Sequence, residues 1–179
     1  MDFHRQYGVD IRIARIFNTY GPRMCLDDGR VVSNFIVQGI QKQCLSLYGD
    51  GGQTRSFCFV EDLVDGLISL MNTAITIPIN LGNSNECTVK ELATEITSIL
   101  GDNEPQFEYR KLPVDDPGRR RPDISKAKKL LGWEPRVSLR EGLERTIEDF
   151  RSRLCHVPAV KVPHQGDALT LSEDLKSYS

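Results

Sequence analysis

A glycine-rich segment that ends in an arginine has the composition of an anion-binding turn. The segment GDGGQTR covers residues 49–55 and places three glycines ahead of Arg55. Glycine lets backbone N–H groups approach an anion closely, and the planar fork of arginine donors suits a diphosphate. An ordinary hairpin turn with a surface arginine is the alternative that this segment leaves open.

A second segment concentrates positive charge. The stretch DDPGRRRPD, residues 115–123, holds Arg119, Arg120 and Arg121 in a row. Such a run is typical of a nucleic-acid patch, of a solvated loop paired to its own aspartates, or of a clamp for an anionic small molecule. The chain has 23 basic and 25 acidic residues and a net charge of −2, which argues against bulk attraction to nucleic acid or anionic membrane. The solvated loop and the clamp for an anionic small molecule remain as interpretations of this segment.

Polar residues also follow a predicted strand. Residues 9–17, VDIRIARIF, alternate apolar and polar positions and then become wholly apolar, which predicts a strand entering a sheet. Asn18 and Thr19 come directly after it, the usual place for ligand contacts in open α/β sheets. A plain turn also favours an asparagine at this point. Arg30 lies beyond the loop MCLDDG, where either a ligand or a nearby aspartate would pair with it.

The elements that must position these residues alternate between helix and strand. Apolar residues at helical spacing and two S/T-x-x-E capping boxes predict helices, and short apolar runs bounded by glycine predict strands. The predicted helices cover residues 31–40 and 61–72 and begin at Thr88 and Ser138; the predicted strands lie within 45–60, on both sides of the glycine-rich turn, and within 77–83.

The two ends of the chain differ from its middle. Residues 2–8 have the pattern of the last turns of a helix with no cap before them, so we expect the chain to be part of a longer protein. From about His156 the chain is polar and without period. We therefore expect one domain over residues 1–155 and a flexible tail over residues 156–179.

Composition restricts the other function classes. The chain has 179 residues, enough for one domain with a core, and no apolar run approaches the roughly 20 residues of a membrane span. The five cysteines have no C-x-x-C spacing, so neither a zinc site nor a disulfide framework is indicated. Cys58, between two phenylalanines, is interpreted as core, and Trp133 as the hydrophobic closure of a helix that ends at Gly132.

Five motifs in a fixed order carry a family resemblance. They are ARIFNTYGPR, DDGRVVSNFI, GDGGQTRSFCFVEDLVDGL, NLGN and DDPGRRRPDISKAKKLLGWEP. The set resembles the extended short-chain dehydrogenase family of nucleotide-sugar enzymes, over about residues 1 to 153. FNTYGPRM followed by DDGRVVSNF is similar to the UDP-glucuronate decarboxylases of that family. The 4-epimerases share the YGP turn, the glycine-rich pattern and the late arginine.

The resemblance implies roles for particular residues. Arg55 would bind the diphosphate of a nucleotide sugar, and Leu47 and Tyr48 would line its uracil. Arg120 would be the functional arginine of the GRRRP segment, near the sugar carboxylate, with its two arginine neighbours solvated. The implied substrate-binding set is Asn18, Arg30, Asn34, Leu47, Tyr48 and Arg55, the implied cofactor contact is Thr19, the implied catalytic residue is Arg120, and no metal is implied.

The implied reaction converts UDP-glucuronate to UDP-xylose and carbon dioxide, with NAD that is recycled. The chain contains no G-x-G-x-x-G turn and no Y-x-x-x-K pair, which relatives carry ahead of the matching region. We therefore expect the C-terminal part of a Rossmann-type α/β enzyme with a mixed α/β substrate lobe, inactive on its own. A non-enzymatic fragment and part of a UDP-sugar 4-epimerase are the alternatives.

Partners and location follow from the same resemblance. We expect a UDP-sugar as ligand, no nucleic acid, and a homodimer for the full-length enzyme. The expected location is the cytoplasm, or the Golgi if a membrane anchor precedes this chain.

Overall fold

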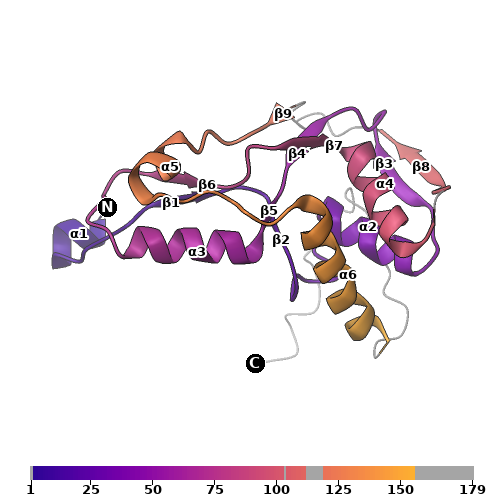
Figure 1. Ribbon diagram of the computed structural model, residues 1–179, viewed down its shortest axis with the longest axis horizontal. Helices are drawn as coiled ribbons and strands as arrows, with labels where there is room; N and C mark the ends of the chain where they lie inside the picture. Colours follow the sequence, from indigo (N-terminus) through magenta and orange to yellow (C-terminus); the bar gives the residue numbers. More distant parts are fainter. Residues whose placement is uncertain (1, 103, 112–118, 156–179) are drawn as a thin grey trace, which may run out of the picture.

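The computed structural model of the chain describes residues 2–102, 104–111 and 119–155 and mixes helices with short strands (Figure 1). The helices are α1 (Asp2–Tyr7), α2 (Val31–Ile40), α3 (Val60–Met71), α4 (Val89–Leu100), α5 (Ser125–Leu131) and α6 (Leu139–Leu154). The strands are β1 (Ala14–Ile16), β2 (Thr19–Tyr20), β3 (Leu45–Tyr48), β4 (Thr54–Ser56), β5 (Cys58–Phe59), β6 (Ile79–Leu81), β7 (Glu86–Thr88), β8 (Phe107–Arg110) and β9 (Arg119–Arg120).

Two hydrophobic cores lie at opposite ends of an elongated molecule. Figure 1 shows α1, α3 and α5 with β1 and β6 at one end, and α2, α4 and α6 with β3 and β8 at the other. The larger core fills the second end and includes the buried rings of Phe35, Phe59 and Phe150. The smaller core includes Leu70, Leu81 and Trp133. The segment from β4 to β5 connects the two ends.

The first predicted strand is shorter than expected. Strand β1 covers only Ala14–Ile16, which pairs in parallel with β6, and residues 9–13 form no strand. Backbone N–H and C=O groups need a neighbouring strand, and β6 offers three residues. Val9 and Ile16 remain exposed. Among the residues described, β6 is the one strand that pairs with β1.

The glycine-rich turn is not the turn of a hairpin. Strand β3 pairs in parallel with β8, whereas β4 pairs antiparallel with β7 and parallel with β9. Residues 49–53 therefore connect strands of two different sheets, and the hairpin alternative for this segment is wrong. The sequence patterns did not indicate β2, β7, β8 or β9, and Arg119–Arg120 is a strand where a loop was expected.

The helix ends follow the capping rules that the sequence predicted. The Thr88 hydroxyl accepts from the Glu91 N–H, and the Glu91 carboxylate accepts in return from the Thr88 N–H, which forms a complete capping box at the start of α4. Ser138 accepts from Glu141 N–H at the start of α6. Gly132 ends α5 with a φ of 62°, a conformation in which glycine avoids a Cβ clash.

Within the part of the chain that the structure describes, no helix is long and apolar enough to cross a membrane. The predicted tail, residues 156–179, lies outside that part, as do Asp115 and Asp116.

Candidate functional site

Arg55 lies in the central strand of the three-stranded sheet β7-β4-β9. Its register partners are Cys87 on β7 and Arg120 on β9. The Arg55 side chain is only 9% exposed, and its Nη1 donates to the Thr54 carbonyl at 2.8 Å. The backbone of Arg120 thus lies beside Arg55, although the side chains of Arg119 and Arg120 lie outside what the structure describes.

The glycine-rich turn before Arg55 is held by the chain itself. Gly49 and Gly51 have φ values of 67° and 76°, and a Cβ at Gly51 would meet Leu47 at 2.8 Å. The Gly49 N–H donates to the Arg110 carbonyl at 2.9 Å, and the Gly52 N–H donates to the Asp50 carboxylate at 2.9 Å. Two of the three glycine N–H groups therefore have protein acceptors and are not free to bind an anion. Anion binding by Arg55 stays a prediction.

The two residues before the turn differ in access. Leu47 is fully buried in the larger core, beneath the turn. Tyr48 is half-buried at the end of β3, and its carbonyl accepts from Gln53 Nε2 at 3.0 Å. Of the two side chains, that of Tyr48 is therefore the more exposed. A contact of either residue with a base stays a prediction.

Asn18 follows the end of β1, as expected, whereas Thr19 is the first residue of β2, a strand that the sequence did not indicate. Both side chains are half-buried. The Asn18 carbonyl accepts from the Cys58 N–H at 2.9 Å, and the Thr19 hydroxyl donates to the Phe17 carbonyl at 3.0 Å. Thr19 and Cys58 are register partners in the two-stranded sheet β2-β5, and Cys58 follows Arg55 by three residues in the sequence.

Arg30 and Asn34 lie at the beginning of α2. Arg30 is exposed, and its Nε lies 3.5 Å from the Asp28 carboxylate. This ion pair is the alternative to a ligand contact that the sequence left open for Arg30. Asn34 Nδ2 donates to the Gly29 carbonyl at 3.2 Å. Asn34 Oδ1 is buried and accepts no hydrogen bond from the described residues. A buried acceptor without a donor is costly, so a ligand N–H or O–H would stabilise it.

The two thiols near this region, those of buried Cys58 and half-buried Cys87, are not poised as nucleophiles. Burial raises the pKa of Cys58 to about 12 and that of Cys87 to about 11. Cys58 is fully buried, which confirms its assignment to the core. Among the residues described, no cluster of histidine, cysteine and carboxylate side chains could hold a metal ion.

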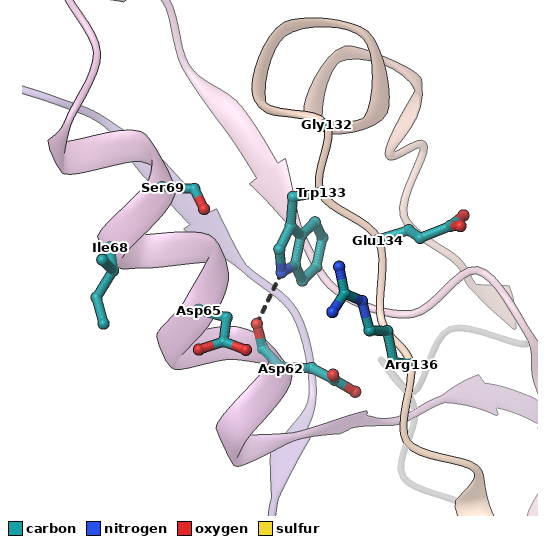
Figure 2. A pocket seen from close by; sticks show the side chains of 8 residues that line it. All are labelled: Asp62, Asp65, Ile68, Ser69, Gly132, Trp133, Glu134 and Arg136. Carbon is teal, nitrogen blue, oxygen red and sulfur yellow. Dashed lines mark hydrogen bonds between the residues drawn. The ribbon is translucent and has the colours of Figure 1, made fainter.

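A separate pocket of about 240 Å³ lies between α3 and the segment that follows α5 (Figure 2). Trp133 forms one wall, and its Nε1 donates to the Asp62 carbonyl at 2.8 Å. The Asp62 carboxylate accepts from the Val137 N–H at 3.0 Å. None of the predicted site residues lines this pocket, and its contacts join α3 to the α5–α6 connection. Trp133 is 6% exposed and closes α5, as predicted.

Sequence reasoning missed Arg110, which is the register partner of Tyr48. Arg110 Nη2 lies 2.8 Å from the Glu108 carboxylate. No local signal could have identified this residue, because β8 joins β3 from a distant position in the chain. An arginine directly after alternating apolar and charged residues carried no turn or motif signature.

The chain is similar to proteins that act on nucleotide sugars. It is 57% identical over 154 residues to UDP-glucuronic acid decarboxylase 1 of Arabidopsis thaliana, a match that covers 86% of this chain and 35% of that protein. UDP-glucuronic acid decarboxylase 3 of the same plant is 57% identical over 155 residues, with 86% and 44% covered. The enzyme from Danio rerio is 53% identical over 154 residues, with 86% and 37% covered. The chain thus spans less than half the length of these curated relatives.

Solved structures confirm the α/β fold. The UDP-glucuronic acid 4-epimerase of Bacillus cereus, in complex with UDP-glucuronic acid and NAD, superposes with a TM-score of 0.77 at 29% identity, over 85% of this chain and 48% of that one. The UDP-glucose 4-epimerase of Thermotoga maritima, with UDP-glucose, gives 0.77 at 32% identity, over 86% and 50%. These are Rossmann-type enzymes, so the predicted fold class is confirmed.

A family model described as GDP-mannose 4,6 dehydratase matches residues 1–146. Because that match covers most of the chain and agrees with the ordered motifs and the fold, the chain belongs to this family of nucleotide-sugar enzymes.

Proposed function

We propose that the chain is the substrate-binding portion of a UDP-glucuronate decarboxylase, which forms UDP-xylose and carbon dioxide. The observation that carries the proposal is the 57% identity to UDP-glucuronic acid decarboxylase 1 over 154 residues, which is 86% of this chain. The fold of the site supports it, because a buried arginine follows a rigid glycine-rich turn. The epimerases in the structural comparison have lower identities, 29% and 32%.

In this proposal the described residues bind and orient the substrate. Arg55 binds the diphosphate, since it is the buried cation of the site and its planar fork matches phosphate oxygens. Asn18 contacts the sugar from the end of β1, and Arg30 reaches the ligand from the start of α2. Asn34 accepts a hydrogen bond from the nucleotide at its unpaired Oδ1. Tyr48 contacts the base next to the glycine-rich turn.

The chemistry takes place at the sugar carboxylate. UDP-glucuronate becomes a β-keto acid when C4 is oxidised, the bond from C5 to the carboxylate breaks with loss of carbon dioxide, C5 takes up a proton, and the ketone is reduced again. Arg120 acts near the carboxylate and C5. An arginine with a pKa above about 12 is a poor proton donor, so Arg120 acts by its charge and by ordering a water molecule.

NAD supplies the oxidation and reduction at C4 when it is bound. The described residues do not fit a complete NAD site: Thr19 is the predicted contact, and one hydroxyl that already donates to the Phe17 carbonyl does not hold a dinucleotide. The chain has no G-x-G-x-x-G segment that would bind the pyrophosphate. We therefore assign no catalytic step of this chain to the cofactor.

The proposal includes the assembly and the location. The complete enzyme is a homodimer, which size-exclusion chromatography with light scattering tests. It acts in the cytoplasm, or in the Golgi if it follows a membrane anchor.

A chimera tests the function. The part of Arabidopsis thaliana UDP-glucuronic acid decarboxylase 3 that precedes the matched region is joined to this chain and supplied with carboxyl-labelled UDP-glucuronate. Release of labelled carbon dioxide together with UDP-xylose supports the proposal. A 4-epimerase retains the label in the nucleotide sugar, and that result would overturn it.

The same chimera tests Arg55. Arg55→Ala should raise the KM for UDP-glucuronate about tenfold to hundredfold and change kcat less, because a diphosphate contact far from C5 binds ground and transition states alike. Arg140→Ala is the matched control. Arg140, on α6, forms an ion pair with Glu95 on α4, and neither residue belongs to the predicted site.

A further inference from the structure

The loop between β2 and α2 joins two parts of the predicted substrate site. Asn18 directly precedes β2, and Arg30 is the N-cap residue of α2. Within the loop, the backbone of Arg23 has a φ of 66°, a left-handed conformation that is uncommon for residues other than glycine. Such a conformation costs free energy and persists only where surrounding contacts hold it. Contacts with the rest of the molecule are therefore expected at this point of the loop.

Two side chains of α6 supply these contacts. The Asp149 carboxylate accepts from the Arg23 N–H at 3.0 Å, and Arg153 Nη2 donates to the Met24 carbonyl at 2.8 Å. Arg153 also donates to the Asp149 carboxylate, through Nε at 2.9 Å and through Nη2 at 2.6 Å. The pair therefore binds the N–H and the carbonyl of two consecutive loop residues.

The pair on α6 is itself held in place. The guanidinium of Arg153 lies 4.8 Å from the centroid of the Phe150 ring, and Phe150 is fully buried in the larger core. The side chains of Asp149 and Arg153 are only 21% and 33% exposed. Helix α6 also packs against α2, the helix that the loop enters (Figure 1). A helix fixed in the core thus presents an acceptor and a donor to the loop.

We propose that Asp149 and Arg153 are positioning residues of the substrate site, which hold the start of the loop and thereby keep Arg30 where it reaches the nucleotide sugar. This inference rests on the proposed function, which assigns a ligand contact to Arg30.

The contacts of Asp28 connect the start of the loop to Arg30. The Asp28 carboxylate accepts from the Arg30 N–H at 3.0 Å, and its Oδ2 lies 3.5 Å from Arg30 Nε. Because Asp28 belongs to the loop, its carboxylate is in place only when the loop is. A loop that is ordered before the ligand arrives loses less conformational entropy on binding, so its anchor on α6 should increase the affinity for the substrate.

Kinetics of the chimera test the inference. Asp149→Ala removes the acceptor of the Arg23 N–H and the partner of Arg153. It should raise the KM for UDP-glucuronate about threefold to tenfold, the range expected when one group is no longer ordered before binding, and change kcat by less than about twofold. Asp149→Asn retains an oxygen acceptor and should raise the KM less. Glu144→Ala is the matched control and should keep the wild-type KM, since Glu144 pairs with Arg140 at 3.2 Å and at the same spacing on α6.

A double-mutant cycle separates positioning from a merely structural role. In an Arg30→Ala background, Asp149→Ala should raise the KM no further, because the loop then has no ligand contact to position. The inference is wrong if Asp149→Ala raises the KM by the same factor with and without Arg30, or if it leaves the KM unchanged. Should Asp149→Ala not fold, Arg153→Lys decides, because lysine keeps the charge but lacks the fork that reaches both Asp149 and Met24. An unchanged KM in that variant would overturn the inference.

Failure of the proposed function gives a different result. If the wild-type chimera releases no carbon dioxide, or if Arg55→Ala leaves the KM unchanged, the proposed function fails and the role of the pair on α6 fails with it. If the chimera is active and Arg55→Ala raises the KM, whereas Arg30→Ala does not, the decarboxylase assignment stands and only the positioning role is overturned.

Discussion

Arg55 and Arg120 are register partners in the parallel pair of β4 and β9. The segments that carry them are far apart in the sequence, and each resembles a separate arginine motif of the nucleotide-sugar enzymes. Their adjacency places both predicted anion contacts on neighbouring strands. This backbone adjacency of two predicted anion contacts leads to the first prediction.

Arg120→Ala should lower decarboxylation by the chimera about 30-fold or more, whereas Arg121→Ala should have a mild effect. Truncating a residue that pairs with a buried charge costs about 2–5 kcal/mol, and exposed pairs contribute at most about 1 kcal/mol. The Arg121 side chain is 51% exposed and lies 3.8 Å from Glu86. Steady-state kinetics on both variants, and on Arg119→Ala, provide the comparison. Wild-type rates in all three would show that the segment is a solvated surface.

Asp62→Ala should destabilise the chimera by about 1–3 kcal/mol, because it removes the buried carboxylate that accepts from the Val137 N–H. Asp65→Ala, an exposed position on the same helix, is the matched control. Urea denaturation of the two variants measures the difference. Equal midpoints would mean that the contact between α3 and the α5–α6 connection contributes little.

The capping box at α4 should contribute to acid sensitivity. The hydrogen bond from the Thr88 N–H lowers the pKa of Glu91 below its ordinary value of 4.5. The unfolded state therefore binds this proton more readily, so the stabilisation is complete above about pH 4.5 and is lost as the pH falls through the lower folded-state pKa. Glu91→Gln should lose less stability between pH 7 and pH 3 than the wild type. Urea midpoints at both pH values, with Glu148→Gln as an exposed control, measure this; identical acid sensitivity in Glu91→Gln and the wild type would contradict it.

Alkylation at neutral pH should label the exposed cysteines and spare buried Cys58 and half-buried Cys87. The thiolate is the reactive form, and a pKa of about 11 leaves Cys87 about one part in ten thousand ionised at pH 7. Cys58, with a pKa of about 12, should react even more slowly. Peptide mass spectrometry after iodoacetamide treatment should find the label on Cys25, Cys44 and Cys155. Early labelling of Cys87 would show that its strand opens readily.

The chain by itself should bind a hydrophobic dye, and the chimera should bind much less. Large apolar side chains are exposed on α1, β1 and α3, and parallel strands such as β1 are normally covered on both faces. These side chains are Phe3, Tyr7, Ile16, Ile68 and Met71. Dye fluorescence and a thermal melt of both proteins make the test. A soluble monomer of this chain with a cooperative melt and no dye binding would instead identify an autonomous domain.

Local patterns were sufficient for the helices. The apolar spacing within residues 31–40 and the Thr88 capping box predicted α2 and α4, because helix hydrogen bonds and caps form between residues a few positions apart. The ordered motifs were likewise sufficient for the family, since each motif is a contiguous string. The conformation of Gly132 followed from its place between an apolar helix and a tryptophan.

The strand pairings were decided by the tertiary structure. A β-strand forms only beside a partner strand. The strand predicted for residues 9–17 was too long, because its partner β6 has three residues. The turn at residues 49–53 suggested a hairpin that does not exist, because the partners of β3 and β4 lie far along the chain. The same pairings place Arg120 beside Arg55 and Arg110 beside Tyr48. The residue types indicated the chemistry of the site. Residues that are neighbours across parallel strands leave no local signal in the sequence, and only the folded sheets bring such residues together.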